Sequence, residues 1–111
     1  MASEFVYKLT DKAEADLDGI VSYISVQLAN RQAAADFLDK LQAAINEACA
    51  FPESGVPVEN EFLPYKAIRK KTISSYIMYY FPDMKAETIY ILRIIYGRRN
   101  LDEILREMSL S

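Results

Sequence analysis

The run from Thr88 to Asn100, TIYILRIIYGRRN, constrains the fold more than any other part of the chain. Its β-branched and aromatic residues are typical of a strand that is buried on both faces. The run stops at Gly97, which permits a sharp backbone turn, and two adjacent arginines follow it. A buried strand that delivers cations at its exit indicates a surface that meets something negatively charged.

The charges are distributed unevenly along the chain. Residues 1–64 contain 4 Lys and Arg against 11 Asp and Glu, a net charge of −7, whereas residues 65–111 contain 9 against 5, a net charge of +4. The overall charge of −3 therefore belongs to a strongly polarised molecule. We expect the functional surface in the basic half.

Length and composition limit both the fold class and the available chemistry. With 111 residues, 51% of them hydrophobic and 26% charged, residues 1–111 are expected to form a single domain. We find neither a run of the roughly 18–20 apolar residues that a membrane span needs nor a signal-peptide pattern at the N-terminus. The single cysteine, Cys49, excludes an internal disulfide and suits a cytoplasmic protein. Because histidine is absent, we expect no metal site and no cofactor, and any catalysis would rest on carboxylates, lysine, tyrosine or arginine.

Hydrophobic periodicity predicts the element order β-α-α-β-β-β-α. Two helices are expected after Thr10 or Asp11 and after Asn30, which are suitable N-caps, and a short third helix after Asn100. Residues 52–64 carry three of the four prolines and are expected to form a surface loop. The predicted strands are Phe5–Leu9, Lys66–Ile73, Tyr76–Phe81 and Thr88–Tyr96.

The two long helices each carry one apolar stripe, and such stripes must be buried. The short connection between them predicts an antiparallel hairpin. Brief turns between the last three strands predict antiparallel pairing. The expected fold class is therefore α+β, with an N-terminal strand, an α-helical hairpin packed on an antiparallel sheet, and a short C-terminal helix.

A cluster of basic residues, Lys66, Arg69, Lys70 and Lys71, lies on the second predicted strand. Strand alternation places Arg69 and Lys71 on one face and the other two on the opposite face. The cluster could bind phosphate or an acidic partner. Lysines on edge strands also discourage unwanted strand pairing, and for this cluster alone we favour that interpretation.

Arg98 and Arg99 are more informative, because they precede a predicted helix N-terminus, where the helix dipole disfavours cations. Asp102 and Glu103 could neutralise them locally. We favour a binding role for the two arginines over local ion pairs.

Arg93 lies inside an apolar run and is expected to share a face with Ile91 and Ile95. A buried arginine needs a partner, because an isolated buried charge is costly. We expect a structural ion pair with Glu14 or Asp16 and give less weight to an active-site role.

The predicted sheet also contains five of the eight tyrosines. Tyrosine beside arginine could stack on nucleic-acid bases or act as a proton donor. Packing is the more common use of each one individually. The five are Tyr76, Tyr79, Tyr80, Tyr90 and Tyr96.

With the element order and the C-terminal motif in place, the chain resembles the RelE/ParE superfamily of bacterial toxins over almost its full length. The matching residues are Tyr7-Lys8-Leu9, Ala13, Asp16-Leu17-x-x-Ile20-x-x-Tyr23-Ile24, Ala34-Ala35-x-Phe37-x-x-x-Leu41, Phe51-Pro52-x-x-Gly55, Tyr65-Lys66-x-Ile68, Ser75-Tyr76-Ile77-x-Tyr79-Tyr80 and Ile91-x-Arg93-Ile94-x-Tyr96-Gly97-Arg98-Arg99. The resemblance implies a growth-inhibiting toxin of a type II toxin–antitoxin module, encoded beside an antitoxin protein that neutralises it.

The resemblance leaves two cellular targets open. RelE-like members cut messenger RNA on the ribosome, and ParE-like members poison DNA gyrase. As a nuclease, this chain would use Arg69 and Arg99 to stabilise the transition state and Tyr76 or Tyr96 to transfer a proton. Tyr76 stands where many of the nucleases carry an arginine, and Leu105 stands near where an acid would lie. We therefore favour the ParE-like alternative.

On the ParE-like interpretation no residue is catalytic, and a set of basic and apolar residues binds the target or the antitoxin. A third alternative is an inactive relative that only binds a partner. The expected binding residues are Lys66, Arg69, Lys70, Lys71, Arg98 and Arg99, with Leu101, Leu105 and Met108 as an apolar docking stripe on the final helix.

Overall fold

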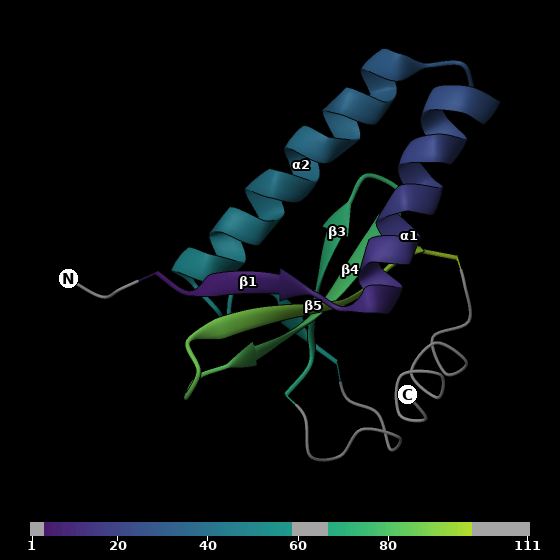
Figure 1. The fold of residues 1–111 in the computed structure, drawn as a ribbon. Coiled ribbons are helices and arrows are strands. Elements are labelled where there is room, and N and C mark those ends of the chain that lie inside the picture. The colour runs from purple at the N-terminus through teal and green to yellow at the C-terminus, as the bar shows by residue number, and fades with distance from the viewer. Residues whose placement is uncertain (1–3, 59–66, 99–111) are drawn as a thin grey trace.

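The computed structural model describes residues 4–58 and 67–98, in which a helical hairpin covers one face of a five-stranded sheet (Figure 1). The helical elements are α1 (Asp11–Ser22), the π-helical turn η1 (Tyr23–Gln27) and α2 (Arg31–Ala50). The strands are β1 (Val6–Leu9), β2 (Val56–Pro57), β3 (Arg69–Ile73), β4 (Tyr76–Asp83) and β5 (Thr88–Tyr96). Among the described residues, no helix combines the length and the apolar character that crossing a membrane requires.

The strand order is β1-β5-β4-β3-β2, and the pairs β2–β3, β3–β4 and β4–β5 are antiparallel. The predicted α+β class and the antiparallel pairing of the last three strands are confirmed. The predicted sheet was antiparallel throughout, but the observed sheet is mixed. Its first strand, β1, pairs with β5 in parallel, with Val6 opposite Thr88. Parallel pairing requires a long crossover connection, and the helical hairpin belongs to that connection. The predicted C-terminal helix lies outside the described residues.

Local capping accounts for where the helices begin. The Thr10 hydroxyl accepts a hydrogen bond from the backbone N–H of Ala13 (3.1 Å), so Thr10 and not Asp11 is the N-cap of α1. Asn30 caps α2 through a bond from the Ala33 N–H (2.9 Å), as predicted. Between them, η1 replaces the last turn of the expected first helix.

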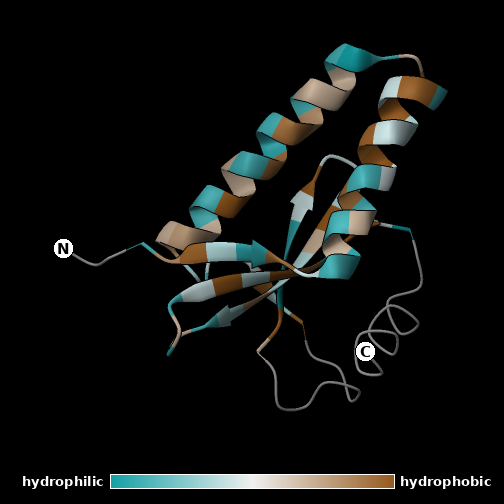
Figure 2. Cartoon of the chain, viewed as in Figure 1, coloured by the Kyte–Doolittle hydropathy of each residue, from teal (hydrophilic) through white to brown (hydrophobic). Residues whose placement is uncertain are grey.

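The main core lies between the sheet and the hairpin, and both helices carry hydrophobic and hydrophilic residues in alternation along their length (Figure 2). Buried side chains of α2 meet those of β4 and β5 there. A smaller cluster contains Ile68, Tyr79 and Ile95. The members of the main core on the helices and the central strands are Ala13, Ile20, Ile24, Ala34, Phe37, Leu41, Ile45, Ala48, Cys49, Met78, Tyr80, Ile89, Ile91 and Ile94.

A β-bulge on β5 corrects one prediction from strand alternation. Tyr79 lies opposite Arg93 and Tyr80 lies opposite Ile91, so Leu92 is an additional residue on β5. Ile91 consequently packs in the main core and Ile95 in the smaller cluster. The expectation that Arg93 shares a face with both isoleucines was wrong, because simple alternation does not continue through a bulge.

Candidate functional site

Arg93 has a structural role, and Asp16 is its partner. Only 7% of Arg93 is exposed, and its Nε and Nη2 donate to the Asp16 carboxylate at 2.8 and 3.1 Å. The same carboxylate accepts the backbone N–H of Ile94 (3.0 Å). Asp16 therefore occupies the edge of β5 beyond the end of β1, where a neighbouring strand would otherwise provide the acceptor. The predicted ion pair is confirmed, with Asp16 and not Glu14.

Arg69 also binds within the molecule, at the start of β3 and opposite Tyr80 in the second half of β4. Its Nη1 donates to the carbonyl oxygens of Glu53 (3.0 Å) and Gly55 (2.8 Å). The buried Tyr80 hydroxyl donates to the Pro52 carbonyl (3.0 Å) and accepts the Gly55 N–H (2.8 Å). We call Pro52, Glu53, Gly55, Arg69 and Tyr80 the Gly55 corner. In this corner Arg69 fastens a loop to the sheet.

The other basic residues that the structure describes differ in their contacts from Arg69. Lys71 forms an ion pair with Glu47 on α2, and Lys70 lies on the opposite face of β3, as alternation predicted. Arg98 is exposed and, within residues 4–58 and 67–98, makes no hydrogen bond or ion pair. The other predicted binding residues, Lys66, Arg99, Leu101, Leu105 and Met108, lie outside the described residues.

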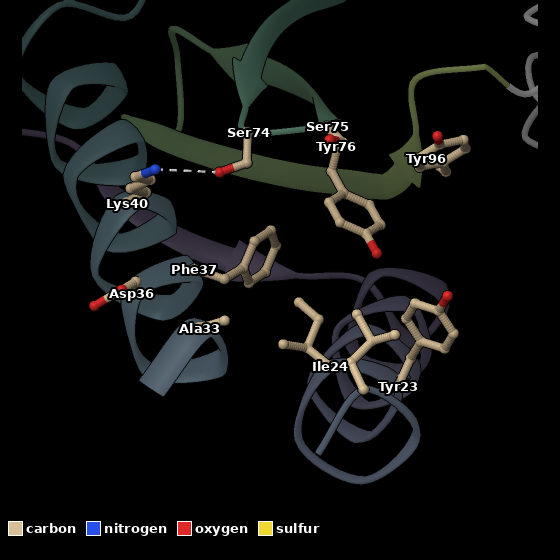
Figure 3. A pocket seen from close by; sticks show the side chains of 11 residues that line it. Tyr23, Ile24, Ala33, Asp36, Phe37, Lys40, Ser74, Ser75, Tyr76 and Tyr96 are labelled. Atoms are coloured by element: carbon tan, nitrogen blue, oxygen red, sulfur yellow. Dashed lines mark hydrogen bonds between the residues drawn. The ribbon is translucent and has the colours of Figure 1, made fainter. Parts of the chain in front are cut away.

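A groove of about 400 Å³ opens at the other end of β4, between the helical hairpin and the sheet (Figure 3). Tyr76, at the start of β4, lies opposite Tyr96, at the end of β5. Their ring centroids are 5.8 Å apart in an edge-to-face arrangement, and Phe37 of α2 meets Tyr76 in the same manner at 5.3 Å. The groove is lined by Tyr23, Ile24, Leu28, Ala33, Asp36, Phe37, Lys40, Ser74, Ser75, Tyr76 and Tyr96.

A second hollow of about 330 Å³ lies beside this groove on the α1 side. Tyr23, Tyr76 and Tyr96 line both, so the two hollows are contiguous. Burial raises the pKa of Tyr76 above 10.0, and the nearby Tyr23 and Tyr96 raise it further. We call the two hollows together the tyrosine groove. It offers apolar surface with phenolic hydroxyls at one end.

Sequence reasoning singled out Tyr76 and Tyr96 but missed the helical side of this groove. Tyr23 belongs to η1 and is 49% exposed, and Leu28, which follows η1, is 55% exposed. Leu28 continues the apolar stripe of the first helix, so the sequence pattern favoured its burial, whereas Tyr23 lies outside that stripe. Their exposure at the hairpin tip was the missing information.

The structure does not bring Arg69 and Tyr76 together as the nuclease alternative requires. Arg69 lies opposite Tyr80, four residues beyond Tyr76 on β4. At the rise of an extended strand, four residues span about 13 Å. Within the described ranges, no group of three or more Cys, Asp or Glu side chains could hold a metal ion. The groove could bind a ligand, whereas Nη1 of Arg69 binds the carbonyl oxygens of Glu53 and Gly55 in a neighbouring loop.

Two sequence comparisons with known proteins agree on one family. Residues 7–101 match the family described as "ParE toxin of type II toxin-antitoxin system, parDE". The chain is 35% identical over 86 residues to Toxin ParE1 of Caulobacter vibrioides, covering 78% of this chain and 85% of that protein.

Two solved structures have the same fold. A chromosomal ParDE toxin–antitoxin system from P. aeruginosa superposes with a TM-score of 0.64 at 22% identity, covering 86% of this chain and 98% of the other. The toxin–antitoxin complex RelBE2 from Mycobacterium tuberculosis gives a TM-score of 0.55 at 19% identity, covering 84% and 98%.

Proposed function

We propose, from the premise that the chain belongs to the ParE family of type II toxins, that it inhibits growth by acting on DNA gyrase. The family match spans residues 7–101 and the relative from Caulobacter vibrioides is itself a ParE toxin. The chain is therefore the toxin component of a type II toxin–antitoxin module. Gyrase as its target, and the cytoplasm as its place of action, are the proposal.

The hydrogen bonds of Arg69 support a mechanism other than RNA cleavage. The nuclease alternative assigns Arg69 to stabilise charge in the transition state, which requires a guanidinium aimed at the substrate. Here its Nη1 donates to the backbone of Glu53 and Gly55. The tyrosines proposed for proton transfer lie at the far end of β4, among aromatic side chains. This separation supports an inhibitor that acts by binding.

We further propose that an antitoxin encoded beside this chain binds and neutralises it. The two similar structures are toxin–antitoxin systems, and this chain has an aromatic groove open to solvent. Arg98 is an exposed cation at the exit of β5 and is assigned to target or antitoxin binding. The assignments of the other residues to the same surfaces stay predictions, as does the single domain over 1–111; these residues are Lys66, Arg69, Lys70, Lys71, Arg99, Leu101, Leu105 and Met108.

Pulse labelling after induction of this chain alone in a bacterial host tests the target. Gyrase poisoning predicts that thymidine incorporation stops within minutes and that cells filament, while methionine incorporation initially continues. The variants Tyr76→Phe and Tyr96→Phe keep the aromatic rings and remove the hydroxyls, so both should remain toxic. An immediate stop in methionine incorporation that these variants abolish would instead establish the nuclease.

A further inference from the structure

We propose that the tyrosine groove accepts an arginine side chain of the antitoxin, held against the rings of Tyr23, Tyr76 and Tyr96. This inference rests on the proposed function and extends it by naming the chemistry that the groove recognises. Three elements supply the tyrosines: η1, the start of β4 and the end of β5. Their convergence depends on the tertiary structure.

The phenolic groups are placed to meet a ligand. Figure 3 shows the hydroxyls of Tyr23 and Tyr76 turned toward the same space, with the ring of Tyr96 beside them. In the part of the chain that the structure describes, none of the three hydroxyls forms a hydrogen bond. Tyr23 and Tyr96 are 49% and 45% exposed, so their rings are accessible. A ligand that combines a flat cationic surface with hydrogen-bond donors would engage both features.

The surrounding charge favours a cation over an anion. Residues 11–50, which contain the helical hairpin, carry seven Asp and Glu against three Lys and Arg, a net charge of −4. Lys40 lines the groove at the end away from the tyrosines and donates to the Ser74 hydroxyl (3.4 Å) (Figure 3). Both oxygens of Asp16 are already engaged by Arg93. A cation entering at the tyrosine end therefore meets aromatic rings beside a helical hairpin of net negative charge.

Arginine fits this site better than lysine. The guanidinium is planar, stacks on aromatic faces and carries five N–H donors that can reach phenolic oxygens. The strip of apolar residues along the groove, including Ile24 and Phe37, would take the aliphatic side chains next to it. The proposed occupant is thus an amphipathic antitoxin segment with one arginine at the tyrosine end.

A double-mutant cycle on the purified toxin–antitoxin complex tests the inference. Tyr23→Leu and Tyr96→Leu are made in the full chain, and each arginine of the antitoxin is changed singly to glutamine. We expect each tyrosine change to weaken binding about 10-fold, within the range of a partly desolvated cation–π contact. One arginine change should weaken binding similarly and cause little further loss in the tyrosine variants. Val26→Ser is the matched control, because Val26 is 69% exposed on η1 and does not line the groove.

The other outcomes would overturn the inference in different ways. If the tyrosine variants weaken binding but every arginine change is additive, an apolar side chain occupies the site. If both tyrosine variants bind like the wild-type chain, the antitoxin lies elsewhere. If the wild-type chain forms no complex with the antitoxin, the proposed function itself fails. Circular dichroism of each variant verifies that the fold is retained.

Discussion

Tyr76 and Tyr80 lie on the same face of β4, one at its start and one in its second half, and their surroundings differ. Tyr80 is fully buried, and its hydroxyl both donates to Pro52 and accepts from Gly55. Tyr76 is half-buried, packs by its ring edges, and lines a groove. The same residue type on the same strand thus closes the molecule at one end and leaves it open at the other.

The difference arises from what lies over each end. At the Gly55 corner a loop backbone comes close enough to supply a donor and an acceptor, so the hydroxyl can be buried without cost. At the other end η1 and the start of α2 lie over the sheet without filling the space, as the cavity shows. A closed end of this kind should contribute to stability, whereas the open end should contribute to binding.

The largest loss of stability is expected from Gly55→Ala. A Cβ there would lie 2.5 Å from the Tyr80 hydroxyl oxygen and 2.8 Å from the Lys70 carbonyl oxygen. Overpacking and the loss of the Tyr80 hydrogen bond together should lower the free energy of unfolding by about 4 kcal/mol, measured by urea denaturation. Gly19→Ala is the control, because its Cβ meets nothing within 4 Å, and it should stabilise α1 by about 1 kcal/mol. Equal effects at the two glycines would contradict a tight corner.

Asp16→Ala tests whether the ion pair between Asp16 and Arg93, which lies beside the open end, stabilises the fold. The change removes the acceptor for Arg93 and for the Ile94 N–H, and Arg93 is buried. We expect a loss of about 3 kcal/mol in the free energy of unfolding, since the buried Arg93 loses the carboxylate of Asp16. Asp18→Ala, at an exposed position on the same helix, should change it by less than about 0.5 kcal/mol. A similar, small effect at both positions would show that the ion pair does not stabilise the fold.

Tyr80→Phe and Tyr76→Phe compare the two ends directly by removing one hydroxyl from each. At Tyr80 the change leaves the buried Gly55 N–H without its acceptor and should cost about 2 kcal/mol. At Tyr76, whose hydroxyl has no hydrogen bond within the described residues, the cost should stay below about 0.5 kcal/mol. Thermal and urea unfolding would measure both. Comparable losses would erase the distinction between the ends.

The smallest effect concerns the titration of Tyr76. Burial raises its pKa above 10.0, and Tyr23 and Tyr96 add to the shift. The folded chain therefore holds a proton that the unfolded chain releases near pH 10, so this contribution to stability is full below that pH and is lost as the pH rises through the raised pKa. Tyr23→Phe should lower the pKa of Tyr76, measured from its ring resonances by NMR. An unchanged pKa would place the two hydroxyls too far apart to share a ligand.

Local sequence patterns predicted most elements, because helix stripes, caps and turns act over a few residues. The predicted last strand, Thr88–Tyr96, matches β5, and Asn30 caps α2. Alternation also placed Arg69 and Lys71 on the face opposite Lys70. Asp16 was named as a partner for Arg93 on the ground that a buried charge requires one. The family resemblance rested on the same local features in their order along the chain.

The tertiary structure alone decided which of these residues meet. The bulge at Leu92 placed Ile91 and Ile95 in different clusters, since one additional residue reverses the alternation beyond it. The loop at Gly55 returned to β3 and β4 and engaged Arg69, which the sequence suggested for binding. Tyr23 reached Tyr76 from 53 positions earlier in the sequence. Contacts between distant segments depend on strand register and on how a hairpin lies over a sheet, and periodicity within one segment contains neither.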